Sequence, residues 1–192
     1  MRPELPASAA WRHQEAREGF ESVFFSADGS GYRLDGHTAA VEDGVAWAVR
    51  YAITLDERWI TRAARVEGQS PSGERSIRLD ADGAGRWEVD GSPMPALDGC
   101  LDLDLESSAC TNTLPMRRLG LGVGQSADAP AAYVRAVDLR VEALAQTYRR
   151  LADDRERERY EYRALRFEFE CLLVYDEFGL VLDYPGIATR VR

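Results

Sequence analysis

The sequence predicts a mainly β protein that forms a single domain over residues 1–192. Short runs of β-branched and aromatic residues recur at near-regular intervals through the first two-thirds of the chain. Gly- and Asp-containing turn signals separate these runs, and the chain is long enough for one substantial core. This rhythm is typical of an antiparallel meander, in which each strand pairs with the next.

Six strands are expected in the first half of the chain, each bounded by a turn signal. Residues 45–55 are long and strongly apolar, which indicates a central strand, whereas Asp35-Gly36 predicts a bend or bulge in the strand before it. Residues 75–80 alternate between polar and apolar side chains, as a half-buried strand does. The expected strands are 20–25, 32–41, 45–55, 59–67, 75–80 and 86–90.

Residues 131–151 fit two different structures. Apolar side chains recur there at intervals of three or four residues, as on an amphipathic helix. Alternate side chains between positions 139 and 145 are also apolar, which would suit one strand of a hairpin. The pattern leaves both structures open, whereas residues 160–175 alternate as one long strand or two, before a hairpin turn at 176–179.

Composition excludes several functional classes. The formal net charge of −9 argues against binding to nucleic acid, since a duplex binder needs a cationic face. The chain contains no lysine, which excludes Schiff-base chemistry and the lysine of a phosphate-binding P-loop. No apolar run is long enough to span a membrane or to form a signal peptide. The three cysteines have no CxxC spacing, so we expect a reduced, cytoplasmic protein with no cofactor.

The densest polar chemistry lies in residues 97–119. Asp102 and Asp104 stand at i and i+2 of an expected strand, so both carboxylates point to one face. We expect this face to be solvated or paired with arginine, while the alternating leucines fill the core. Such a pair could instead hold a metal or divide acid and base roles. No other acids or histidines stand at metal-ligand spacing, so no metal is expected.

A polar loop is expected after this strand. Pro115 fixes the backbone locally, the Thr and Asn side chains offer hydrogen bonds, and Arg117 and Arg118 present two cations. Arginine suits the bidentate recognition of carboxylate or phosphate. We therefore expect Asn112, Arg117 and Arg118 to bind the polar head of a ligand. The alternative is that at least one arginine pairs with the acids of the neighbouring strand.

Two segments carry a family resemblance: Thr-Asn-Thr-Leu-Pro at 111–115 and Asp-Tyr-Pro-Gly at 183–186. Over residues 87–190, and more loosely before, the chain resembles a family of bacterial proteins described as putative glycolipid-binding. The resemblance implies a strongly curved antiparallel sheet or incomplete β-barrel with few short helices, similar to the lipoprotein carriers of the bacterial Lol system. On that analogy residues 131–151 form strands.

One function and two alternatives follow. We expect a cytoplasmic, non-enzymatic binding protein whose β-barrel-like cavity takes an amphipathic small molecule such as a glycolipid, with acyl chains in an apolar interior. The first alternative is a hydrolase that acts on a lipid or glycolipid through Asp102 and Asp104. The second is a protein-interaction module or homodimer without a small ligand. Homo-oligomerisation is compatible with each of the three.

Overall fold

A computed structural model describes residues 3–15, 17–29 and 31–191. Among these residues, fourteen strands form one large sheet and three more form a small second sheet. The large sheet has two free edges, β8 and β10, so it is not closed into a barrel. The predicted incomplete barrel is thus confirmed. The strand order in the large sheet is β10-β13-β14-β15-β16-β17-β1-β2-β3-β4-β5-β6-β7-β8.

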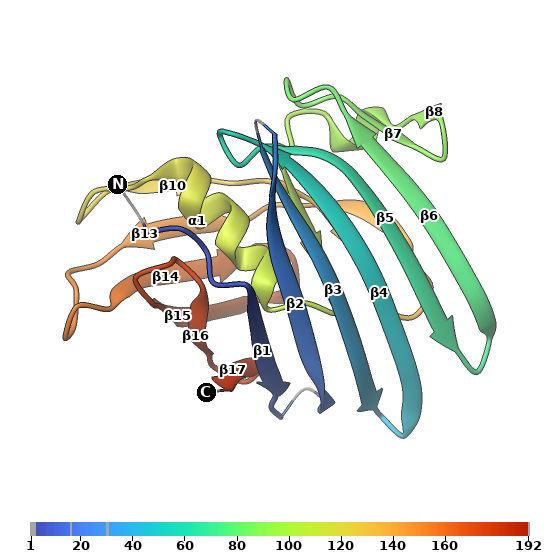
Figure 1. Ribbon diagram of the computed structural model, residues 1–192, viewed down its shortest axis with the longest axis horizontal. Coiled ribbons are helices and arrows are strands. Elements are labelled where there is room, and N and C mark those ends of the chain that lie inside the picture. The colour runs from blue at the N-terminus through green and yellow to red at the C-terminus, as the bar shows by residue number, and fades with distance from the viewer. Residues whose placement is uncertain (1–2, 16, 30, 192) are drawn as a thin grey trace.

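The N-terminal strands form the predicted antiparallel meander, which Figure 1 shows as a wide, twisted layer. In the central strand β4, alternate side chains from Trp47 to Leu55 are buried, while those between them are exposed or half-buried. The bounds are β1 Ser8–His13, β2 Glu18–Asp28, β3 Gly31–Glu42, β4 Val45–Asp56, β5 Thr61–Ser70, β6 Gly73–Ala81, β7 Trp87–Val89 and β8 Ser92–Pro93.

The bend predicted at Asp35-Gly36 is wrong, because β3 keeps an unbroken register with both neighbours. Gly36 pairs with Tyr51 of β4, and a Cβ at position 36 would lie 2.0 Å from Cζ of the Tyr51 ring. The glycine is needed because this ring lies across the strand, not because the chain turns. In this position the Tyr51 hydroxyl donates a hydrogen bond to Glu21 at 2.6 Å.

The C-terminal strands form the other side of the curved sheet. In Figure 1 they run across the direction of β2–β6, with α1 between the two groups. β17 pairs with β1, so the last strand of the chain joins the first. The bounds are β10 Ser126–Asp128, β13 Thr147–Arg150, β14 Glu158–Ala164, β15 Phe169–Tyr175, β16 Val181–Tyr184 and β17 Ala188–Val191, with a 3-10 turn η3 at Leu165–Phe167.

Residues 131–151 are strands, as the family resemblance implies. β11 (Ala131–Val134) and β12 (Val141–Leu144) form a hairpin, and β13 follows. The apolar residues with helix-like spacing do not share one buried face, since Val137 is exposed on the turn and Val141 is half-buried, while Val134 and Leu144 lie in the core. Pairing with other strands overrides the local helical pattern.

The segment from 95 to 119 packs between the two sides of the large sheet. It contains 3-10 turns η1 (Pro95–Leu97) and η2 (Cys110–Asn112), strand β9 (Asp102–Leu105), which pairs in parallel with β11, and helix α1 (Thr113–Leu119). Its buried apolar side chains belong to the same cluster as those of the meander. They occupy the interior in which acyl chains were expected.

The polar loop predicted over 111–118 is wrong, since most of it is helical. Pro115 falls in the first turn of α1, where a missing N–H leaves no helical hydrogen bond unmade. Gly120 follows the helix with φ of +55° and ψ of +38°, the left-handed conformation in which glycine commonly ends a helix. The proline and the glycine thus mark the two ends of a short helix.

We predict that Gly36→Ala destabilises the fold by about 1–3 kcal/mol, because the added methyl group would overlap the Tyr51 ring. The free energy of unfolding in urea measures this. Gly122→Ala is the matched control, since Gly122 is exposed and its nearest neighbour is the flexible end of Gln125. Equal stability of the two variants would contradict the packing argument.

Candidate functional site

A cavity of about 350 Å³ lies where β9, β11 and the C-terminal strands meet. Its lining comes from segments far apart in the chain, from the β1–β2 turn to the β16–β17 turn. Ligand pockets in proteins span about 300–1,000 Å³, so this one is small. It has the size for the head of a lipid but not for its acyl chains as well.

Asp104 forms the acidic side of the cavity. Thr111 donates its hydroxyl proton to one carboxylate oxygen at 2.8 Å, and Gln146 Nε2 donates to the other at 2.5 Å. Burial raises the pKa of Asp104 to about 6; the two hydrogen bonds lower it, and the charges of Asp102 and Glu106 raise it further. The carboxyl group therefore titrates close to neutral pH.

Asn112 stands beside Asp104 in the cavity lining. Its Oδ1 accepts a hydrogen bond from the Tyr148 hydroxyl at 2.8 Å, and its backbone carbonyl accepts one from the Tyr175 hydroxyl at 3.2 Å. These contacts fix the side chain, which is 3% exposed. No hydrogen bond of its amide nitrogen is found among the described residues, and this atom is not one of the fully buried unpaired ones, so it is open to a ligand or water in the cavity.

Aromatic rings form much of the remaining lining. Tyr162 packs against Phe169 and Tyr184 with ring centroids 6.2 and 5.9 Å apart, and Tyr133 packs against Phe167 at 5.5 Å. Burial raises the pKa of Tyr162 and Tyr184 well above the usual value, so both hydroxyls stay protonated. The cavity therefore combines apolar ring surfaces with neutral hydroxyl groups.

Two arginines reach the cavity, and acids or carbonyls lie against both. Arg17 is 7% exposed; its Nη1 donates to the Glu106 carbonyl at 2.8 Å, and its Nε lies 3.6 Å from the Glu42 carboxylate. Arg135 Nη1 lies 3.3 Å from the Glu106 carboxylate. Since these cations have acidic neighbours and Asp104 adds negative charge, the cavity has no excess of positive charge.

A second buried carboxylate, Glu21 of β2, holds the turn that carries Ser108 and Asn112. Glu21 accepts hydrogen bonds from the hydroxyls of Tyr51 and Ser108 and from the backbone N–H of Ala109 at 2.8 Å. Burial raises its pKa, and these hydrogen bonds oppose the rise. Glu21 thus fixes the 107–112 turn against the meander, and Ser108 itself lines the cavity.

The acids of β9 are not on a solvated face, as one reading of the sequence had it. Asp102 and Asp104 are both buried, because β9 is covered on both sides. The paired alternative holds for Asp102: Arg118 donates from Nε at 2.9 Å and from Nη2 at 2.6 Å. Asp102 does not line the cavity, so the two carboxylates envisaged for a hydrolase do not face one ligand.

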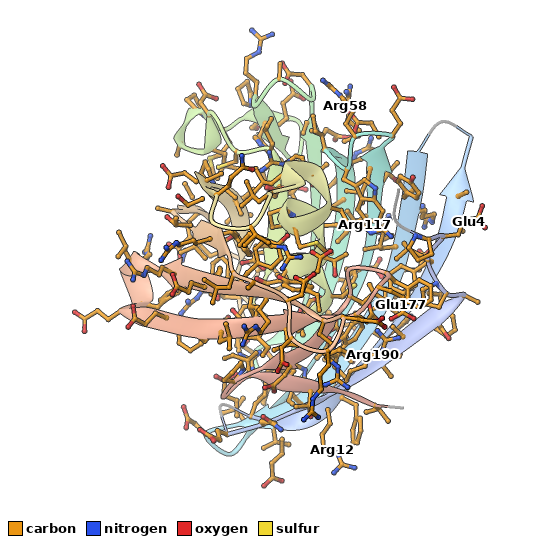
Figure 2. The ribbon with its side chains drawn as sticks, turned by 90° about the vertical axis from the view of Figure 1, so that its left-hand side faces the viewer. Glu4, Arg12, Arg58, Arg117, Glu177 and Arg190 are labelled. Carbon is orange, nitrogen blue, oxygen red and sulfur yellow. The ribbon has the colours of Figure 1, made fainter. Side chains whose placement is uncertain are left out.

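Arg117 lies elsewhere. Its guanidinium is 4.3 Å from the centre of the Trp59 ring, and its Nε donates to the Phe178 carbonyl at 2.9 Å. It lines a second, larger hollow of about 570 Å³ beside the N-terminal segment, to which Glu4 also contributes; Figure 2 labels both residues. Asn112, Arg117 and Arg118 are therefore not gathered into one site, and their contact with a ligand stays a prediction.

Several lining residues were missed at the sequence level. Arg17, Tyr133 and Tyr184 come from different elements, and no local pattern links them. Glu21 did leave a signal: it shares the inward face of its strand with Val23, and a lone acid at an inward position calls for a buried partner.

No three His, Cys, Asp or Glu side chains among the described residues are grouped to hold a metal ion. No helix in this part of the chain has the length and apolarity to cross a bilayer. Cys100, Cys110 and Cys171 are all free.

Known proteins similar to this chain point to one family. A family described as "Putative glycolipid-binding" matches residues 8–190, which confirms the resemblance and extends it toward the N-terminus. The crystal structure of a DUF1089 family protein from Pseudomonas aeruginosa is 36% identical, covers 89% of this chain and 92% of its own, and has a TM-score of 0.78. No curated protein matches the chain.

A more distant structure shares the fold alone. This β-barrel-like protein, a domain of unknown function DUF1849 from Brucella abortus, is 12% identical. The match covers 99% of this chain and 96% of the other, with a TM-score of 0.53. The incomplete barrel therefore occurs in proteins of very different sequence.

We predict that Asp104→Asn gains stability relative to wild type as the pH rises. The folded protein holds a proton on Asp104 up to a pKa of about 6, above the usual 3.8, so the wild type loses stability through this window and the amide does not. The difference in unfolding free energy should grow by about 2–3 kcal/mol from pH 4 to pH 7.5. Urea unfolding at both pH values measures it, and a constant difference would contradict the assignment.

We predict that Arg118→Met destabilises the protein by about 3–5 kcal/mol, because Asp102 would be left buried without its cation. Replacing both partners, as Arg118→Met with Asp102→Leu, should recover most of this loss. Urea unfolding of the single and double variants checks both statements. A double variant no more stable than the single one would show that the ion pair is not the source of the loss.

Proposed function

Because the chain belongs to the family described as "Putative glycolipid-binding", we propose that it is a non-enzymatic binding protein for an amphipathic ligand such as a glycolipid. The proposed site is the 350 Å³ cavity beside β9. The observation that carries the proposal is that the cavity lining places the Asn112 side chain and the Asp104 carboxylate together among aromatic rings.

A sugar head fits this chemistry. Each hydroxyl group of a sugar both donates and accepts hydrogen bonds, so it can donate to Asp104 and accept from Asn112. Rings such as Tyr162 and Phe169 offer flat apolar surfaces to the C–H faces of the sugar. The compensated charge of Arg17 and Arg135 favours an uncharged head over a phosphate or carboxylate.

The hydrogen bonds and ion pairs of the acidic side chains in and beside the cavity favour binding over hydrolysis. Asp104 already accepts two hydrogen bonds, and Asp102 is held by Arg118. Glu106 accepts a hydrogen bond from the backbone of Ala136 and lies against Arg135. Among the described residues, Asp104 therefore has no unpaired carboxylate beside it with which to divide the roles of general acid and general base.

The residues expected from sequence take different parts in the proposal. We propose that Asn112 contacts the ligand, whereas Arg117 and Arg118 position α1 through their contacts with Trp59 and Asp102. A cytoplasmic setting is also part of the proposal, and the three free cysteines support it.

Calorimetric titration with monomeric octyl β-D-glucopyranoside tests this function. We expect saturable binding that glucose alone and octanoate alone do not match, because head and chain both contribute. Ile187→Trp, which puts a larger side chain on the cavity lining, should weaken binding at least about tenfold. Ile77→Trp is the control, since Ile77 is also half-buried but lies on β6, away from the cavity.

Arg117→Ala separates this site from the hollow beside the N-terminal segment. Octyl glucoside binding should survive this change, because Arg117 does not line the cavity. If Arg117→Ala abolishes binding and Ile187→Trp does not, the ligand lies in that hollow and the cavity is the wrong site. If the wild type binds no alkyl glucoside at all, the proposed function fails.

A further inference from the structure

Exposed apolar side chains gather on two neighbouring turns. Leu165 is 74% exposed and Phe167 is 40% exposed, both on the 3-10 turn η3 between β14 and β15. Val137, which is 41% exposed, lies on the turn between β11 and β12. We call Leu165, Phe167 and Val137 the apolar tip. A single exposed apolar side chain is ordinary, but several on adjacent turns mark a contact surface.

The apolar tip is continuous with the mouth of the cavity. Phe167 belongs to both, since it lines the cavity and packs against Tyr133 at 5.5 Å. The guanidinium of Arg135 lies 5.9 Å from the Tyr133 ring and 5.8 Å from the Phe167 ring. Arg166 of η3 pairs at 2.7 Å with Glu142 of β12, which fastens the two turns together.

The charges around the apolar tip nearly cancel. Arg166 pairs with Glu142, Arg163 lies 3.4 Å from Glu170, and Arg135 lies 3.3 Å from Glu106. The same two turns also carry Arg140, Asp138 and Glu168, which add one cation and two anions. In a chain of net charge −9 this region is therefore close to neutral. It lacks the opposite charge that would attract a strongly charged protein or nucleic acid. An uncharged or zwitterionic lipid surface does not require such a charge.

The size of the cavity also favours a lipid surface as the partner. About 350 Å³ accommodates a lipid head, so the acyl chains of a bound lipid must leave through the mouth. The apolar tip stands at that mouth. A protein that takes the head of a lipid while its chains stay in the bilayer must hold its cavity at the membrane surface.

We propose that the apolar tip docks the protein on a lipid bilayer, with Leu165 and Val137 inserted at the level of the lipid heads. The inference rests on the proposed function, because the cavity gives the docked protein its ligand. Docking itself needs only the apolar side chains, so it is measured on vesicles that contain no glycolipid.

Flotation with phosphatidylcholine vesicles tests the docking. The wild type should float with the vesicles, and Leu165→Glu should lower its affinity for them about tenfold, a change of about 1.4 kcal/mol. Val123→Glu is the matched control. Val123 is 63% exposed but lies near Arg150, at the opposite end of β13 and β14 from Leu165, so this variant should float like the wild type.

Tryptophan substitutions report insertion directly. The four native tryptophans are buried, so quenching by brominated phosphatidylcholine reports mainly the introduced ring. Leu165→Trp should be quenched and Val123→Trp should not. Equal quenching of the two variants would overturn the proposal, as would a wild type that does not float.

Two further outcomes separate docking from other roles. Leu165 does not line the cavity, so Leu165→Glu should still bind octyl glucoside saturably, with a loss much smaller than that of Ile187→Trp. If the wild type floats but binds no alkyl glucoside, docking stands and the proposed function fails. If Leu165→Glu instead lowers the mass measured by light scattering without vesicles, the apolar tip joins two copies of the chain and the proposal is wrong.

Discussion

The structure depends above all on how one buried carboxylate, Glu21, is satisfied. An enclosed carboxyl group is costly unless donors surround it, and Glu21 finds them in Tyr51 and in the turn that includes Ser108 and Ala109. This requirement fixes the 107–112 turn against the meander. The placement of Asn112, of helix α1 and of one side of the cavity follows from it.

The two acids of β9 also need partners for a buried carboxylate, and each finds a different kind of partner. Asp102 has its own cation, Arg118, and is closed off from the cavity. Asp104 has only neutral donors; burial raises its pKa to about 6, and its carboxyl group lines the cavity. Two identical side chains on one strand thus differ in role because different partners reach them.

In the proposed site, polar groups lie at the inner end and apolar groups lie at the mouth. Asp104 and Asn112 lie among hydrogen-bonding partners, aromatic rings line the cavity, and exposed apolar side chains such as Leu165 stand beside its mouth. An amphipathic molecule has the same order from head to tail. The family match and the small cavity volume agree with this arrangement, which no single motif in the chain displays.

The sequence by itself determined the β class, the meander and the family, because strand alternation, turn residues and short signatures are local properties. It named an arginine as one partner for Asp102, beside solvent, a metal and a shared acid and base role. Only the tertiary structure decided that β9 is buried on both faces, that 113–119 is helical and that Asn112 faces a cavity without Arg117 or Arg118. Local alternation shows which residues share a face, whereas what covers that face comes from distant segments, as Gln146 does for Asp104.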